Sequence, residues 1–333
     1  MVSSLIFWLI VFVVSLAVLV KGADWLIESA EKIGLALGLS PFIAGVLIVG
    51  MGTSFPELVS SLFATFRGIT DVVVANAVGS NIANILLIVG LSAVVGRRLV
   101  VSKNLIDLDL PLLAISTVLM LGVVFDGKVT LGESILLLLA YGIYLLYTIL
   151  HKDDAGGEFI EILPSRKTRR ELALISKKKN GANPKILMKD VLFLLTGVLG
   201  LVLGAKYLID SLINLSEILN IGTGVIAITA VALGTSLPEL LVSVKAAWQK
   251  KSEIALGNIF GSNVFNALVV VGIPGLFKVL DVDSQTLLIG VPTMALVTLL
   301  FVISGVSKRI HLWEGAFYLC VYILFLGKLF NWF

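Results

Sequence analysis

The chain has 333 residues, of which 58% are hydrophobic and 14% charged, and its formal net charge is +3. So much apolar surface exceeds what a single soluble core can bury, which excludes an ordinary soluble domain. Apolar runs of about 20 residues, long enough to cross a membrane, recur along almost the whole chain. The composition therefore predicts an all-α membrane protein. Its expected macromolecular surrounding is membrane lipid, and the small net charge indicates no nucleic-acid partner.

Ten transmembrane helices are predicted from apolar length, from glycine and proline breaks, and from the charged segments between the runs. They lie at about residues 4–33, 41–66, 72–94, 108–125, 129–150, 187–215, 222–248, 253–277, 285–305 and 311–331. The first run has neither a basic start nor a small-residue cleavage pattern, so we expect a retained helix rather than a signal peptide.

Basic residues are concentrated in alternate loops, which predicts the orientation of the chain because lysine and arginine favour the cytoplasmic side. The basic loops hold Lys32, Arg97, Arg98, Lys103, the segment 152–186, Lys250, Lys251, Lys308 and Arg309, whereas the other loops hold Arg67, Lys128, Lys278 and Lys328. We therefore expect a multi-pass protein of the cell membrane with both termini outside. The basic segment 152–186 is expected to be a solvated cytoplasmic linker, in preference to a segment bound to anionic lipid.

The sequence has too few cysteines and histidines for an intrachain disulfide or a zinc site. Cys320 is the single cysteine, so an intrachain disulfide is impossible. His151 and His311 are the two histidines, too few for a zinc site. No cofactor is predicted.

The chain contains an internal repeat with a constant offset of 182 residues. Gly-Thr-Ser-Phe-Pro-Glu at 52–57 matches Gly-Thr-Ser-Leu-Pro-Glu at 234–239, and Gly-Ser-Asn at 79–81 recurs at 261–263. Each copy, 1–151 and 187–333, contains five predicted spans, and an odd number reverses the direction of the second copy. The pattern therefore predicts two inverted five-helix repeats with a substrate site near the bilayer midplane, where the copies meet.

Each repeated motif places a carboxylate, Glu57 or Glu239, in the middle of a predicted span, where a charge is costly and usually functional. Pro56 and Pro238 should break the helix and free backbone carbonyls. Asp24 lies near a span end, where solvation at the membrane surface explains it. The expected oxygen donors are the carboxylates of Glu57 and Glu239, the hydroxyls of Thr53, Ser54, Thr235 and Ser236, and the amides of Asn84 and Asn266.

A site built wholly of oxygen selects hard cations such as calcium or sodium. The repeat would bring Glu57 and Glu239 together, and their repulsion must be relieved by a divalent ion, by several monovalent ions or by protons. This shared requirement is the chemical basis for exchange.

The two motif blocks, Gly52 to Asn84 and Gly234 to Asn266, resemble the alpha-repeats of the sodium/calcium exchanger family, within the cation/calcium antiporter superfamily and nearest to its prokaryotic sodium:calcium antiporters. The resemblance covers all ten predicted spans, with alpha-repeats at about 41–94 and 222–277. It implies a secondary active antiporter that exchanges Ca²⁺ for Na⁺ by alternating access. It also implies that the first and sixth helices slide against the other eight.

The resemblance also assigns ion-binding positions. Calcium would be held by Glu57, Glu239 and the backbone carbonyls of Thr53 and Thr235. The flanking sodium sites would use the carbonyls of Gly50 and Ala232, the hydroxyls of Ser54, Ser236, Ser80 and Ser262, and the amides of Asn84 and Asn266. Some family members, including potassium-dependent ones, have Asp where this chain has Asn266, so potassium co-transport is disfavoured.

A calcium/proton antiporter is the nearest alternative function, because glutamates take up protons as readily as sodium ions. The hydroxyls of Ser54, Ser80, Ser236 and Ser262 favour sodium, since a proton carrier does not need them. An intramembrane hydrolase built on Ser54 or Ser236 is disfavoured because no histidine or lysine lies nearby in sequence, and the chain is not predicted to be an enzyme. A passive channel would differ from an antiporter in needing no counter-ion gradient. We expect a functional monomer.

Overall fold

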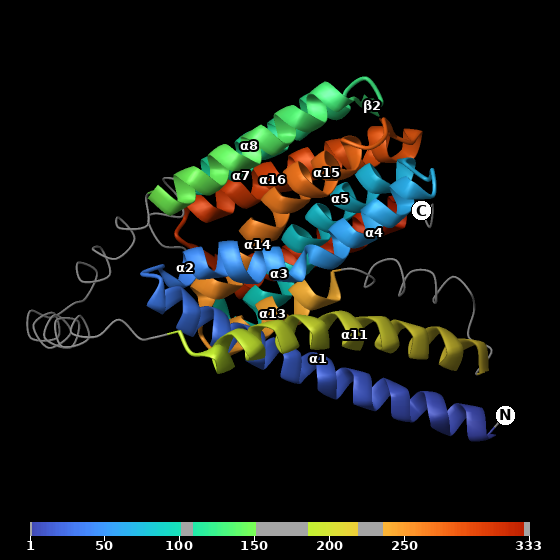
Figure 1. Cartoon of the computed structure of the whole chain (residues 1–333), viewed down its shortest axis with the longest axis vertical. Coiled ribbons are helices and arrows are strands. Elements are labelled where there is room, and N and C mark those ends of the chain that lie inside the picture. The colour runs from blue at the N-terminus through green and yellow to red at the C-terminus, as the bar shows by residue number, and fades with distance from the viewer. Residues whose placement is uncertain (1, 101–108, 151–185, 219–235, 330–333) are drawn as a thin grey trace, which may run out of the picture.

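The computed structural model describes residues 2–100, 109–150, 186–218 and 236–329, which form a bundle of helices (Figure 1). In chain order the helical segments are α1 (Val2–Ala36), α2 (Pro41–Ala44), η1 (Gly45–Gly50), α3 (Met51–Thr53), α4 (Phe55–Phe66), α5 (Asp71–Ala83), η2 (Asn84–Val89), α6 (Gly90–Gly96), α7 (Leu110–Val124), α8 (Leu131–Leu150), α11 (Met188–Ile218), α13 (Leu237–Trp248), α14 (Ser252–Phe265), η5 (Asn266–Val270), α15 (Val271–Gly275), η6 (Thr286–Gly290), α16 (Val291–Val306) and α17 (Leu312–Leu329). The segments named η are π-helical.

Most of the predicted spans are confirmed as apolar helices. Within the described ranges, 8 helices are long and apolar enough to cross a membrane. The predicted span 108–125 is the shorter helix α7, which begins after Asp109. The predicted span 222–248 lies partly outside the described residues, and α13 is its described part. The inverted relation of the two copies stays a prediction, and the predicted linker 152–186 lies outside the described residues except for Ile186.

Apolar side chains cover the outside of the bundle and its central segment is buried, as expected for a protein solvated by lipid. Every residue in the apolar window of Ser252–Gly275, the segment that contains α14, is buried, whereas 17% of the window in α1 is buried. Large side chains such as Ile143 on α8 and Val118 on α7 are exposed. The segment α14–η5–α15 is therefore the centre around which the other helices pack.

Helices α1 and α11 lie side by side along one face of the bundle (Figure 1). Their backbones touch through glycines: a Cβ added at Gly22 would lie 2.9 Å from the carbonyl oxygen of Gly197, and one added at Gly204 would lie 2.8 Å from Cγ of Leu19. Small residues that allow such close approach are the usual means of helix association in membranes. The two helices therefore form a tightly packed pair.

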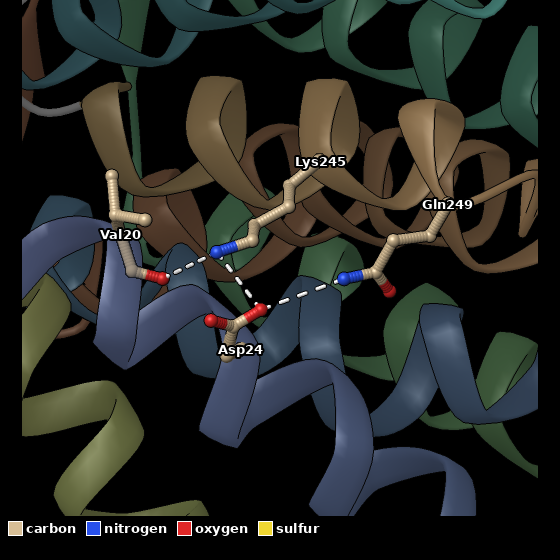
Figure 2. Close-up of polar contacts among 4 residues, drawn as sticks. All are labelled: Val20, Asp24, Lys245 and Gln249. Carbon is tan, nitrogen blue, oxygen red and sulfur yellow. Dashed lines mark hydrogen bonds and ion pairs between the residues drawn. The ribbon is translucent and has the colours of Figure 1, made fainter.

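A polar contact joins α1 to α13 (Figure 2). The Lys245 ammonium lies 2.8 Å from the Asp24 carboxylate and also donates to the Val20 carbonyl at 2.8 Å. The Gln249 amide donates to the same carboxylate at 3.5 Å. Asp24 therefore has a specific partner across the helix interface, which its position near a span end did not predict.

Two short antiparallel ladders, which the sequence analysis did not predict, close the ends of the bundle. Strand β1 (Arg98–Val100) pairs with β4 (Arg309–His311), and β2 (Lys128–Val129) pairs with β3 (Leu280–Asp281). The repeat offset of 182 relates β1 to β3 and β2 to β4. Each ladder thus joins one copy to the other. Because β2 follows β1 by one span, the ladders lie at opposite ends of the bundle.

Candidate functional site

Equivalent serines of the two Gly-Thr-Ser-x-Pro-Glu motifs precede a new helix, and in the first motif the serine separates α3 from α4. The backbone angles are φ −86° and ψ 2° at Ser54, and φ −87° and ψ 7° at Ser236. A new helix starts directly after each serine, with Pro56 or Pro238 in its first turn, where a missing N–H does no harm. Pro56 therefore lies at the start of a second helix segment rather than kinking a continuous one.

The break places Glu57 in the first turn of α4 and Glu239 in the first turn of α13. The N-terminal end of a helix carries partial positive charge, which stabilises a carboxylate there. Both side chains are buried, at 0% and 1% exposure. The local sequence thus holds two carboxylates inside the bundle, each supported by its own helix.

Backbone irregularity also marks the other repeated motif. The π-helical segments η2 and η5 begin at Asn84 and Asn266, which are equivalent positions of the two copies. A third, η1, ends at Gly50, directly before the first broken motif. Such π-helical turns are rare and occur frequently at functional sites. Three of the four π-helical segments in the described ranges therefore begin or end at predicted ion-binding residues, and η6 is the exception.

The first and second copies meet at a hydrogen bond between predicted site residues. The Ser54 hydroxyl donates to Oε1 of Glu239 at 3.0 Å, and both residues are buried. Oε2 of Glu239 has no hydrogen-bond partner in the described part of the chain. A serine hydroxyl that donates to a carboxylate can rotate and offer its oxygen to a cation instead. This pair can therefore serve as part of a cation site.

A second group of contacts surrounds the end of α3. The Thr53 hydroxyl lies 3.0 Å from Oδ1 of Asn258 and 3.4 Å from the Ser262 hydroxyl. The Gly50 carbonyl accepts from the Ser262 hydroxyl at 3.3 Å and lies 3.3 Å from the Thr53 hydroxyl. Three predicted residues, Gly50, Thr53 and Ser262, therefore lie together, and Asn258 joins them.

The other predicted ion-binding residues differ in their hydrogen bonds. The Ser236 hydroxyl lies 3.4 Å from that of Ser80, and the Asn84 amide donates to Oδ1 of Asn263 at 3.3 Å. Asn266 is fully buried, and neither polar atom of its side chain has a hydrogen-bond partner among the described residues. Thr235 and Ala232 lie outside the described residues, so their predicted roles are not tested.

Several polar residues at the site were not predicted. The amide of Asn258 donates to the Ser243 hydroxyl at 2.8 Å, and the amide of Asn76 donates to the Ser61 hydroxyl at 3.4 Å. These two contacts are equivalent under the offset of 182. Asn81 also donates to the carbonyl of Asn263, its own equivalent, at 3.1 Å. The repeat contained the signal, because each of these asparagines and serines recurs at the same offset.

The donor set determines what the site can bind. Hydroxyl, amide, carbonyl and carboxylate oxygens suit hard cations. No cluster of three or more His, Cys, Asp or Glu side chains occurs in the ranges that the structure describes. The two buried carboxylates, Glu57 and Glu239, carry two negative charges, which one divalent cation or two monovalent cations would balance.

An apolar helix bundle that encloses such a polar centre is the architecture of an ion-transporting membrane protein. The profile of a family described as "Sodium/calcium exchanger protein" matches residues 7–150 and 189–330. The chain therefore belongs to the sodium/calcium exchanger family, a family of membrane transporters.

Relatives along the full length agree with this assignment. The chain is 33% identical to the sodium/calcium exchanger MaX1 of Methanosarcina acetivorans, over 96% of this chain and 98% of that protein. It is 32% identical to the inner membrane protein YrbG of Escherichia coli, over 87% and 86% of the two chains. Among solved structures, the sodium-calcium exchanger NCX_Mj soaked with zero Na⁺ and Ca²⁺ matches with a TM-score of 0.80 at 27% identity, covering 98% of this chain and 99% of that one.

Proposed function

We propose that this protein is a secondary active antiporter that exchanges Ca²⁺ for Na⁺ by alternating access. The observation that carries the proposal is the buried hydrogen bond from Ser54 to Glu239, which joins the broken motif of one copy to that of the other. A carboxylate at this depth, with one oxygen lacking a partner among the described residues, requires a cation or a proton to offset its burial. The exchanger names of MaX1 and NCX_Mj support calcium and sodium as the ions.

In this mechanism, Glu57 and Glu239 bind calcium in one step of the cycle and sodium ions in another. The two kinds of ion compete for the same oxygens, so neither occupies the site while the other does, and transport is coupled. The hydroxyls of Ser54, Ser80 and Ser262 supply further oxygens for sodium. The neutral amide of Asn266 leaves two formal negative charges at the site, which disfavours a potassium ion as an additional substrate.

The test is calcium uptake into proteoliposomes that contain the full chain. Vesicles loaded with sodium and diluted into sodium-free buffer should accumulate radioactive calcium, and equal sodium on both sides should abolish the accumulation. Glu57→Gln and Glu239→Gln should each reduce uptake to background, because glutamine keeps the shape of the side chain and removes its charge.

Glu133→Gln is the matched control. Glu133 accepts hydrogen bonds from the backbone N–H and hydroxyl of Thr130 at the start of α8, a capping role that glutamine also performs. This variant should transport normally. Normal uptake by either site variant would overturn the paired-carboxylate mechanism. Uptake that ignores sodium and follows an imposed proton gradient would replace the sodium assignment with calcium/proton antiport.

A further inference from the structure

One end of the bundle has a surface of exposed cations around the β1–β4 ladder. This surface, the basic patch, consists of Arg97, Arg98, Lys250, Lys308 and Arg309. The central pair of the ladder, Leu99 and Ile310, is fully buried. Because side chains alternate along a strand, Arg98 and Arg309 lie on the outer face of the ladder.

Hydrogen bonds join the helix ends that carry the basic patch. The Lys250 ammonium donates to the Gly96 carbonyl at the end of α6, at 3.1 Å. The backbone N–H of Leu312, at the start of α17, donates to the Arg97 carbonyl at 3.2 Å. The five cations form no ion pair within the described ranges, whereas the neighbouring Lys251 is paired with Glu31. These bonds hold the helix ends that carry the basic patch together at one end of the bundle.

Three members of the basic patch have a backbone conformation that disfavours any side chain. The φ angle is 65° at Arg97, 63° at Lys250 and 65° at Lys308, and these are the non-glycine residues with positive φ in the described part of the chain. Left-handed residues after a helix are usually glycine, because a Cβ costs free energy there. The chain thus keeps a cation at three positions where glycine would be less strained.

Neither the helix dipole nor membrane orientation requires this arrangement. At the other end of the bundle, α4 is followed by Arg67 and then by Gly68, which has a φ of 82°. Arg67 can complement the helix dipole while glycine takes the left-handed position. Membrane orientation likewise depends on positive charge anywhere in the loop, and it does not require that charge at the left-handed residue. The charge in the basic patch therefore has a use specific to its location.

Two tryptophans define the depth of the basic patch in the membrane. Trp248 ends α13 two residues before Lys250, and Trp313 lies at the start of α17 next to the ladder; their exposed fractions are 71% and 75%. Exposed tryptophan is enriched at the headgroup level of membranes. The cations just beyond these rings would lie among the lipid phosphates.

We propose that the basic patch is a binding site for the phosphate of anionic lipid headgroups. Arginine and lysine bind phosphate through charge-assisted hydrogen bonds, and a cluster of them beside a membrane attracts anionic lipid. The left-handed residues Arg97, Lys250 and Lys308 are exposed at this end of the bundle, and the Lys250 ammonium also donates to the Gly96 carbonyl. This lipid site is separate from the ion-exchange centre and does not depend on it.

The test compares thermal unfolding of the detergent-solubilised full chain with added phosphatidylglycerol or phosphatidylcholine. Phosphatidylglycerol should raise the melting midpoint above that in phosphatidylcholine. The variant with Arg97→Gly, Lys250→Gly and Lys308→Gly should change its midpoint in phosphatidylcholine little, because the relief of left-handed strain offsets the lost hydrogen bond from Lys250 to the Gly96 carbonyl. It should lose more than half of the increment given by phosphatidylglycerol.

A charge-matched control carries Arg67→Ala, Lys128→Ala and Lys278→Ala at the opposite end of the bundle and should keep the full increment. If the glycine variant keeps the increment, or if the control loses as much, the site is wrong. An equal shift with free inorganic phosphate would overturn the assignment to lipid. Should the triple glycine variant be poorly folded, Lys250→Gly and Lys308→Gly alone should each remove part of the increment, and no loss in either would also overturn the proposal.

Discussion

Asn266 shows how a single residue can tune the charge of the site. It is fully buried at the start of η5, and its polar atoms have no hydrogen-bond partner among the described residues. An unpartnered buried amide costs free energy. Its equivalent, Asn84, donates to Asn263 at 3.3 Å, so the two copies use this position differently. We infer that Asn266 contributes to ion binding without adding formal charge.

Asn266→Asp tests this inference. The variant should keep measurable calcium transport, while its uptake depends more steeply on pH than that of the wild type, because the new carboxylate can be protonated. Uptake measured at a series of pH values in proteoliposomes gives both results. Asn266→Ser adds no titratable group and should keep the wild-type pH profile. Loss of both folding and calcium binding in the Asp variant would indicate a packing role instead.

Among the helical elements, the contact between α14 and η1 sets the geometry of the site. A Cβ added at Gly261 would overlap the carbonyl oxygen of Val46 in η1, and one added at Gly257 would overlap that of Phe42 in the preceding α2, so the backbone of α14 is in direct contact with this segment. This approach brings Asn258 and Ser262, on the same face of α14, to Thr53 and Gly50. Gly261, in the second copy of the Gly-Ser-Asn motif, and the neighbouring Gly257 therefore have a packing role that positions the polar residues beside them.

Gly261→Ala should separate α14 from η1, because the Val46 carbonyl is backbone and cannot move away cheaply. We expect destabilisation of about 1–3 kcal/mol. Calcium uptake should fall strongly, since Ser262 would move away from Gly50. Gly122→Ala on α7 is the control, because an added Cβ there meets nothing within 4 Å. This variant should keep the melting midpoint and the calcium uptake of the wild type. Melting midpoint and uptake are measured for both variants, and wild-type uptake by Gly261→Ala would contradict this packing argument.

The ion pair between α1 and α13 leads to a second prediction for the helical elements. Lys245→Met should lower the melting midpoint by a few degrees, corresponding to about 1 kcal/mol for a partly exposed pair. Lys32→Met, which removes an exposed lysine from α1, should have little effect. Exchanging the two charges, with Asp24→Lys and Lys245→Asp, should recover part of the loss. Equal midpoints for Lys245→Met and Lys32→Met would show that the pair contributes nothing.

At the scale of the whole molecule, the two ladders and the central contacts connect the copies at three levels. The β1–β4 ladder closes one end, the β2–β3 ladder closes the other, and the Ser54–Glu239 contact joins the copies in between. Equivalent strands occupy opposite ends, which is the arrangement expected if the second copy is inverted. These connections support the proposed inverted repeat, whereas the proposed orientation, with the basic loops in the cytoplasm, rests on the distribution of lysine and arginine.

Cysteine labelling tests this orientation. In a Cys320→Ala background, a membrane-impermeant thiol reagent added outside intact cells should modify Val2→Cys and spare Ile175→Cys. Val2 belongs to the N-terminal end, predicted to lie outside, and Ile175 belongs to the predicted cytoplasmic linker 152–186. Permeabilised cells should be labelled at both positions. The opposite labelling pattern in intact cells would reverse the proposed topology.

Local patterns in the sequence were sufficient to predict a mostly helical membrane protein, most of its spans and several of the buried polar residues at the candidate site. Apolar length depends on the thickness of the bilayer, and the repeat at 182 residues is visible without any knowledge of packing. The same offset singled out Ser54, Glu57, Glu239 and Asn266. Each of them is buried, and Ser54 contacts Glu239.

The tertiary structure alone decided which of these residues touch. The contacts of Asn258 with Thr53, of Lys245 with Asp24 and of β1 with β4 join residues far apart in the chain. Each depends on the angle and depth at which two helices pack, and those are set by close backbone approach at glycines such as Gly261. A repeat offset states that two segments are equivalent, but it contains no information on the distance between them.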